Sequence, residues 1–509
     1  MLTGSTSEIS TFKGEQRALR ADRIGTPGLL LSVLAATAPL MVVAGVVPTT
    51  FAAVGIVGVP LIFLILGVVL VLFSFGYAEM SRHVHNAGAF YAYIARGLGG
   101  TAGAAASYVA LFSYSILQMG IFGIFGFEIS SQIAQHWHHN VDWWWPALGG
   151  VLLTGVFGAL KIDVNARVLG VLLLVETTLV VIFDISFLSD AGPQGVSLHA
   201  FDPGTIGGAG FGTALCFCIA GFTGFEQAPV YAEETSRPQR VVARVMFLAV
   251  GFATLLFAFS AWAITVAAGP AQVVGMAQKS PTMLFDLNQA RIGGTFTDVL
   301  NVFFITGIFA SMLSFHNVVA RYAFAMGRDG LLPAAVSRTT RSGGAPVVGS
   351  LIQSTAALIA VICFAVTDDK PGGDPSFAPM MRLFTWAGNV GALGVVLLMA
   401  AASIAVIAFF VKRGAARVQA WRLATSGLAA AALLAIAFYA VKDFRVLLGA
   451  DPGHGLRWIL PGIIGLALLI GLVYGLVLHS KNPAAHARIG LGNEAFQLDK
   501  AATAAEPTA

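Results

Sequence analysis

Long apolar runs dominate the pattern of hydrophobic and polar positions along this 509-residue chain. Twelve of them begin near residues 29, 57, 102, 145, 167, 207, 243, 298, 345, 381, 422 and 457. A helix of about 20 apolar residues crosses about 30 Å of hydrocarbon, and each run is long enough to do so. The pattern therefore predicts an all-α integral membrane protein with twelve transmembrane helices.

The composition supports this class of protein. Hydrophobic residues make up 57% of the chain and charged residues 11%, against about 25% charged residues in an ordinary soluble domain. Cys216, Cys218 and Cys363 lie in apolar stretches, and their odd number and spacing suit neither a disulfide framework nor a zinc site. The sequence has no Walker-type phosphate loop, no clustered metal ligands and no nucleophile–base pair. We therefore expect no enzyme activity, cofactor or metal.

Basic residues predict how the chain lies in the membrane. The tails and the loops between spans can be assigned alternately to the two sides of the membrane. Seven of the 29 Lys and Arg residues then fall on the side opposite to the tails: Lys279, Arg291, Lys370, Arg382, Lys442, Arg445 and Arg457. The other 22 lie on the side of both tails, which the positive-inside rule places in the cytoplasm. The charge thus indicates a topology in the cell membrane and no nucleic-acid partner. The tails, 1–26 and 484–509, are expected to lack stable structure.

The sixth apolar run contains a break, Ala220-Gly221-Phe222-Thr223-Gly224. Lipid offers backbone groups no partner at this depth, so irregular backbone is tolerated only where it lines a cavity enclosed by protein. In transporters such a break is where a solute binds. The alternative is a glycine pair that packs helices together, which is common in membranes.

The first run carries a matching break at Thr37-Ala38-Pro39, because proline lacks an N–H and disfavours helix at the preceding residue. A simple proline kink is the alternative. The breaks are five spans apart, and an odd offset inverts topology. Together they indicate two inverted five-helix repeats with a binding site between them. We place these repeats at 27–188 and 207–411, followed by two additional helices at 422–479.

Three strings resemble signatures of the amino acid–polyamine–organocation permeases. They are Tyr77–Arg82 with Asn86–Tyr93, Gly224–Glu226 with Ala232–Thr235, and Arg321–Pro333. Their order and spacing make the resemblance specific over nearly the whole hydrophobic chain. It implies a leucine-transporter-type fold with broken helices one and six, and secondary transport of amino acids or related amines.

The resemblance also implies roles at the breaks. In the family, a small-residue turn in span one holds the substrate carboxylate, and its positions match Thr37-Ala38-Pro39, while carbonyl groups of span six hold the amine. Tyr114 and Gln118 would line the cavity from span three, and Phe222 would be the aromatic lid. Pro39 departs from the pattern because it supplies no N–H. Either the Thr37 hydroxyl replaces that donor, or the substrate is an amine without a carboxylate.

Glu176 lies near the middle of the fifth run, where a carboxylate costs about 2.5–3.5 kcal/mol on insertion scales. Desolvation favours the neutral form, which suits a reversible proton carrier. The position resembles one where many family members carry a lysine in the space of a sodium ion. A protonated Glu176 would substitute for that lysine, whereas an ionised one would hold a cation with Ser311 and Ser314 of span eight. The alternative is a structural carboxylic acid.

Other polar residues in the apolar runs are further candidates. Glu226 resembles the family's common acid after the break and suits coupling or gating, or else stabilises the second half-helix through its dipole. His316 can titrate near neutral pH, although a lone histidine in a packed helix is more often bonded to a neighbour. Asp184 is expected at the interface. Trp386 and Asn389 belong either to the cavity wall or to helix–helix contacts.

The sequence therefore predicts a secondary active transporter that moves an amino acid by alternating access, with coupling to protons expected and sodium as the other candidate. A permease or exchanger of polyamines or other organic amines is the alternative. A non-transporting receptor would be expected to carry a sizeable folded tail, and a channel does not need two inverted broken helices. The expected partners are the solute, the coupling ion and the lipid bilayer.

Overall fold

The structure is a computed structural model that describes residues 19, 24–158, 162–208, 210–280, 282–340, 344–367, 377–412, 420–449 and 455–492, without the side chains of 162–168, 377 and 381. Apart from an isolated bridge between Ile24 and Thr235, the regular structure in these ranges is helical. The predicted all-α fold is thereby confirmed.

Ten helices in the described ranges are long and apolar enough to cross a membrane. The first is interrupted and consists of α2 (Thr26–Thr37), α3 (Pro39–Met41), the π-helical turn η1 (Val42–Val46) and α4 (Val47–Val54). The others are α5 (Val59–Ser81), α7 (Gly100–Trp137), α9 (Ile162–Ser189), α11 (Pro238–Ala268), α14 (Gly294–Arg328), α15 (Val347–Val366), η7 with α16 (Phe377–Trp386 and Ala387–Lys412), α17 (Ala420–Lys442) and α19 (Leu456–Lys481). The chain is a multi-pass membrane protein.

Two predicted spans are shorter in the structure. The fourth is α8 (Trp144–Gly158), with 15 residues, and the sixth is divided into α10 (Phe211–Ala220) and the 3-10 helix η4 (Phe225–Glu234). Because the sixth span is broken, neither half reaches membrane length by itself. The count of twelve spans and the inverted repeat remain predictions.

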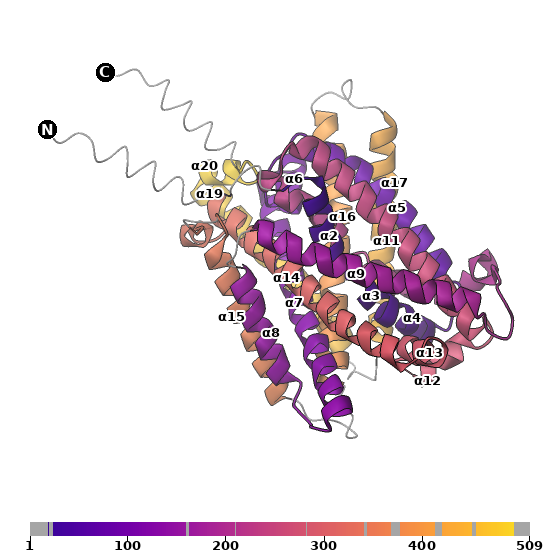
Figure 1. Ribbon diagram of the computed structural model, residues 1–509. Helices are drawn as coiled ribbons and strands as arrows, with labels where there is room; N and C mark the ends of the chain where they lie inside the picture. Colours follow the sequence, from indigo (N-terminus) through magenta and orange to yellow (C-terminus); the bar gives the residue numbers. More distant parts are fainter. Residues whose placement is uncertain are drawn as a thin grey trace, which may run out of the picture.

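Short helices lie at both ends of the bundle. Figure 1 shows α6 (Ala89–Leu98) and α20 (Pro483–Arg488) at the end opposite to α12 (Val273–Lys279) and α13 (Met283–Arg291). The charge pattern assigns these two pairs to opposite sides, with α6 and α20 in the cytoplasm. Helix α20 corrects the expectation that the chain from 484 onward lacks structure, since the described chain continues to residue 492. Most of the N-terminal tail and residues 493–509 lie outside the described residues.

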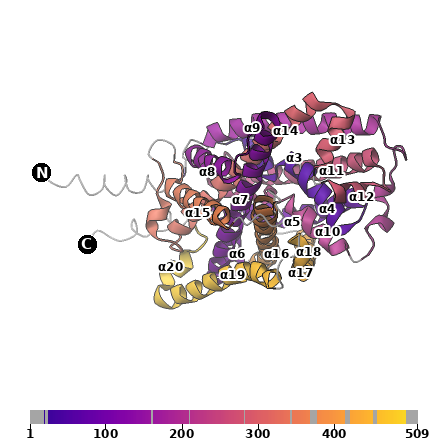
Figure 2. The same ribbon diagram turned by 90° about the horizontal axis from the view of Figure 1, so that it is seen from below.

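Small residues bring the helices into close contact. A Cβ on Gly97 of α6 would lie 2.2 Å from the Ala405 carbonyl oxygen of α16, so only glycine allows this approach. Such packing matters in lipid because the bilayer removes the hydrophobic drive between helices. Figure 2 shows α19 along the rim of the bundle, where it exposes Leu466, Leu469 and Val473. This is the surface expected of a lipid-facing helix.

Candidate functional site

The first span breaks at the predicted position. Helix α2 ends at Thr37, Ala38 adopts a left-handed conformation with φ of 41°, and α3 begins at Pro39. The Thr37 hydroxyl donates to the Leu34 carbonyl oxygen at 2.7 Å. It is therefore engaged within its own helix, and the missing N–H of Pro39 is not replaced by it.

The sixth span breaks over residues 221–224. Helix α10 ends at Ala220, whose carbonyl oxygen accepts the Thr223 N–H at 3.1 Å, and η4 begins at Phe225. Gly224 has φ of 128°, a conformation that residues with a Cβ rarely adopt. The glycine is therefore required where the chain changes direction.

The two breaks lie against each other. A Cβ on Gly224 would lie 2.8 Å from Ala36 Cβ and 3.1 Å from Thr37 N. A Cβ on Gly221 would lie 2.9 Å from a methyl group of Val42. The absence of side chains at the two glycines lets span six approach the backbone of span one. The structure thus brings the two halves of the predicted binding site together.

Glu176 of α9 reaches the break in span one. Its side chain is buried, and Oε1 accepts the Leu40 N–H at 2.5 Å. Leu40 is the second residue of the helical run that begins at Pro39, where N–H groups lack carbonyl partners and the helix dipole favours an anion. Gly307 of α14 makes room, since a Cβ there would lie 2.6 Å from Glu176 Oε2. The carboxyl group therefore bonds the N–H directly after Pro39, next to the positions Thr37-Ala38-Pro39 that the resemblance assigns to a substrate carboxylate.

Two serines join α14 to the same span. Ser311 Oγ donates to the Ala36 carbonyl oxygen at 2.9 Å, and Ser314 Oγ donates to the Ser32 carbonyl oxygen at 3.0 Å. Both hydroxyls thus face α2, and that of Ser311 bonds a carbonyl group next to the break.

Glu226 connects span six to α7. Its side chain is fully buried. Oε1 accepts the Tyr114 hydroxyl at 2.7 Å, and Oε2 accepts the Gly224 N–H at 2.8 Å. The predicted wall residue Tyr114 therefore reaches the break through this carboxyl group. Glu226 in turn holds the backbone at the point where η4 begins.

The sequence model for amino acid permeases matches residues 30–442. The chain belongs to the amino acid permease family. Among solved structures, the Eremococcus coleocola manganese transporter in complex with an aromatic bis-isothiourea substituted compound is similar over 96% of this permease and 97% of that chain, with a TM-score of 0.57 and 14% identity. A mutant of that transporter covers the same shares with a TM-score of 0.55 and 12% identity.

At these identities the likeness shows the fold alone, and that fold is one of membrane transporters. A comparison with curated protein sequences gives no match. Family and fold together place this permease among transporters, in agreement with the sequence prediction.

Two predicted site residues of this permease face α15 instead of the breaks. Gln118 Oε1 accepts a hydrogen bond from Gln353 Nε2 at 2.6 Å. The His316 ring is buried, with Nε2 2.7 Å from Ser350 Oγ. These contacts join α7 and α14 to α15. For His316 they match the alternative that a lone histidine in a packed helix is bonded to a neighbouring residue.

Phe222 and Asp184 are both buried. The Phe222 ring packs against Phe63 of α5 and Phe257 of α11, with centroid distances of 5.9 and 5.6 Å. Asp184 of α9 accepts the Ser260 hydroxyl of α11 at 2.6 Å. The lid role of Phe222 and the level of Asp184 at the membrane interface remain predictions.

Trp386 and Asn389 hold the short helix α18 (Phe444–Leu447) and its end. Trp386 Nε1 donates to the Leu448 carbonyl oxygen at 3.0 Å, and Asn389 Nδ2 donates to that of Leu447 at 2.6 Å. Trp386 and Asn389 were expected either in the cavity wall or in helix–helix contacts, and these bonds match the second alternative.

An ion-pair network beside α6 was not predicted as a site. Arg328 donates to both carboxylate oxygens of Glu233 at 2.7 and 2.8 Å, and Arg321 donates to Glu234 at 2.5 and 3.0 Å. Glu233 also accepts the Ala87 N–H at 2.9 Å. These residues come from the three strings that carry the family resemblance, so the strings meet in space. Opposite charges inside those strings were the signal that the sequence offered.

Proposed function

We propose that this permease moves an amino acid together with protons across the cytoplasmic membrane, by alternating access around the breaks in spans one and six. The observation that carries the proposal is the hydrogen bond from the Leu40 N–H to Glu176. It places a buried, titratable carboxyl group on the donor that a substrate carboxylate needs.

Competition for this donor supplies the coupling. While Glu176 is ionised, its charge fills the positive end of the helical run that begins at Pro39. A proton on Glu176 removes that charge and releases the Leu40 N–H to the carboxylate of the solute. Binding of the proton and of the solute therefore favour each other, with a coupling free energy of about 1–3 kcal/mol as is typical of linked sites.

The other break suits the amino group of the same solute. Helix α10 ends there at Ala220, and the negative end of its dipole favours a cation at the break. The Glu226 carboxyl group follows within two residues of Gly224. A zwitterion thus meets a negative environment at span six and, once Glu176 is protonated, a positive one at span one.

A proton on Glu176 is the simpler form of coupling. The carboxyl group binds a proton without further ligands, whereas a sodium ion there would also need oxygen ligands such as the hydroxyls of Ser311 and Ser314. In the structure these hydroxyls donate to the carbonyl oxygens of Ala36 and Ser32.

An organic amine without a carboxylate is the second candidate solute. Pro39 supplies no N–H at the break, and Glu176 already uses that of Leu40. A solute that carries only amino groups would leave both features undisturbed.

Uptake into proteoliposomes tests the proposal. The purified permease is reconstituted, and radiolabelled amino acids and amines are screened with and without a pH gradient. We expect uptake of an amino acid that a pH gradient drives, and Glu176→Gln is expected to abolish that drive. Asp184→Asn is the matched control, because Asp184 is a buried carboxyl of the same helix that bonds α11 and not the break.

The outcomes separate the two parts of the proposal. If no amine-bearing solute enters, the transport function is wrong. If the Glu176→Gln variant folds, transports and still responds to the pH gradient, Glu176 is not the coupling group. Uptake of amines to the exclusion of amino acids would favour the second candidate.

A further inference from the structure

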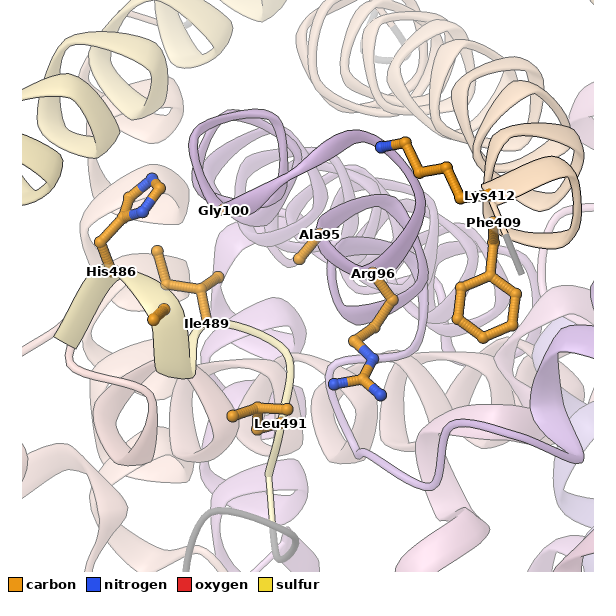
Figure 3. A pocket seen from close by; sticks show the side chains of 9 residues that line it. Ala95, Arg96, Gly100, Phe409, Lys412, His486, Ile489 and Leu491 are labelled. Carbon is orange, nitrogen blue, oxygen red and sulfur yellow. The ribbon is translucent and has the colours of Figure 1, made fainter. Parts of the chain in front are cut away.

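A pocket of about 370 Å³ opens at the end of the molecule where α6 and α20 lie. Figure 3 shows the side chains of Arg96 and Lys412 facing it from α6 and α16, and that of His486 on the opposite wall. Phe409, Ile489 and Leu491 add apolar surface. Three parts of the chain that are distant in sequence therefore build one pocket: α6 with the start of α7, the end of α16, and the segment from α20 onward.

The charged side chains that line this pocket are basic. Arg96 and Lys412 carry fixed positive charges, and among the lining residues in the described part of the chain none is Asp or Glu. Lys412 Nζ donates to the Gly97 carbonyl oxygen at 2.9 Å, which holds its ammonium group beside α6. Helix α7 begins at Gly100, another lining residue, so the positive end of a 38-residue helix also faces the pocket.

His486 forms the wall opposite these charges. Its Nε2 lies 3.0 Å from Thr101 Oγ1, in the first turn of α7. Partial burial and the nearby His479 lower the pKa of His486 below its ordinary value. The ring is therefore mainly neutral at pH 7, and the permanent charge of the pocket comes from Arg96 and Lys412.

We propose that this pocket binds a phosphate-bearing anion, either the headgroup of an anionic phospholipid or free phosphate. Basic pockets between transmembrane helices at the cytoplasmic side bind anionic headgroups by the same electrostatics. The volume falls within the range of about 300–1,000 Å³ that is usual for small-molecule sites. It therefore has room for a phosphate and the group attached to it, and the apolar residues suit the glycerol and the first carbons of a lipid.

Access from the membrane favours the lipid source. Helix α19 leads directly into α20, and it exposes Leu472, Val473 and Leu476 as a lipid-facing surface. Lipids along this helix have their headgroups at the level where α19 ends, next to His486. A headgroup can thus enter the pocket while its acyl chains stay against α19.

Occupation of the pocket would also fasten the C-terminal segment. The Gly490 N–H donates to Asp329 Oδ2 at 2.8 Å, directly after α14, and Ile489 is buried. An anion between His486 on one wall and Arg96 and Lys412 on the other bridges this segment to α6 and α16. The bound anion is therefore expected to stabilise the docked position of residues 483–492.

Lipid retention by the full-length permease tests this proposal without reliance on transport. The wild type and the Arg96→Gln/Lys412→Gln variant are placed in nanodiscs of phosphatidylcholine, with or without phosphatidylglycerol, and co-purifying lipid is measured by native mass spectrometry. We expect the wild type to retain phosphatidylglycerol selectively and the variant to retain it about thirtyfold less, because removing two basic residues near an anionic surface costs about 2 kcal/mol. Arg240→Gln/Arg244→Gln is the control, since it removes two exposed charges from the same predicted side.

A second arm distinguishes the sources of the anion. Inorganic phosphate and glycerol phosphate are titrated onto the permease in phosphatidylcholine nanodiscs, and the apparent melting temperature is recorded. Saturable stabilisation that the Arg96/Lys412 variant loses, without selective lipid retention, would assign the pocket to free phosphate. The proposal is overturned if the folded variant retains lipid and responds to phosphate as the wild type does, or if the control variant loses as much.

Discussion

Gly224 and Glu226 shape the break in span six together. Gly224 supplies a backbone conformation and a close approach that a Cβ would prevent, and Glu226 holds the Gly224 N–H in place. Backbone strain of this kind is found at functional sites when the surroundings enforce it. The glycine is therefore a position where a single added methyl group tests the geometry of the whole break.

We expect Gly224→Ala to destabilise the permease and to abolish uptake. The added Cβ would meet Ala36 and Thr37, and the left-handed conformation is strained for alanine by about 1–3 kcal/mol. Gly251→Ala on α11 is the control, because a Cβ there meets no atom within 4 Å. Thermal unfolding in detergent and initial uptake rates check both variants. A Gly224→Ala variant as stable and active as Gly251→Ala would contradict the close approach of the two spans.

Removal of the Tyr114 hydroxyl tests the link between α7 and span six. Tyr114→Phe leaves a buried oxygen of Glu226 without its donor, and a hydrogen bond to a charged group is worth about 1.5–3 kcal/mol. Tyr108→Phe on the same helix removes a half-buried bond to the Leu331 carbonyl and should lower stability less. Equal melting temperatures for the two variants would show that Glu226 does not depend on Tyr114.

At the scale of elements, the ion pairs beside α6 fasten the end of η4 to α14. The side chains of Arg328 and Glu233 are only 4% and 2% exposed, so neutralising either one takes from the buried charge of the other a partner bound by two hydrogen bonds. We expect Arg328→Gln and Glu233→Gln each to lower the free energy of unfolding by about 3–5 kcal/mol. The double variant should lose much less than the sum. Arg82→Gln, at a pair where Arg82 is 46% exposed, should lose at most about 1 kcal/mol. Additive losses in a double-mutant cycle would contradict a direct pair.

Elements were more predictable from sequence than their faces. Runs of apolar residues and the positions of Gly224 and Pro39 predict the helices and both breaks, because chain length and backbone chemistry are local properties. Which face of a helix meets which neighbour depends on how the helix is rotated about its own axis in the packed bundle. Gln118 and His316 accordingly point at α15, although their positions in the apolar runs were identified correctly.

In the candidate site, too, the residues could be identified from the sequence but their contacts could not. The sequence marks Glu176 as a costly buried carboxyl group, yet its bond to the Leu40 N–H depends on how α9 crosses the first span. Likewise, the Thr37 hydroxyl looks free in the sequence but donates within its own helix. The bond from Ser260 to Asp184 could not be predicted either, because Ser260 lies on α11, more than 70 positions further along the chain.

For the whole molecule, alternating access requires the ends of spans one and six to separate on one side. The structure joins them beside α6, where the Ile24 N–H donates to the Glu234 carbonyl oxygen and the Ser236 N–H to that of Ile24, both at 3.1 Å. The network of Glu233, Glu234, Arg321 and Arg328 closes the same end. Under the proposed alternating access, we therefore expect these contacts to break and reform in each transport cycle.

The central claim is that a proton on Glu176 accompanies the solute, and proton movement is its most direct measurement. A pH-sensitive dye is enclosed in proteoliposomes that hold the permease, with no initial gradient, and the amino acid identified by uptake is added outside. The account predicts that the lumen acidifies as the amino acid enters, and that Glu176→Gln admits the amino acid without acidification. Entry of the amino acid into wild-type vesicles with no change in lumenal pH would contradict it.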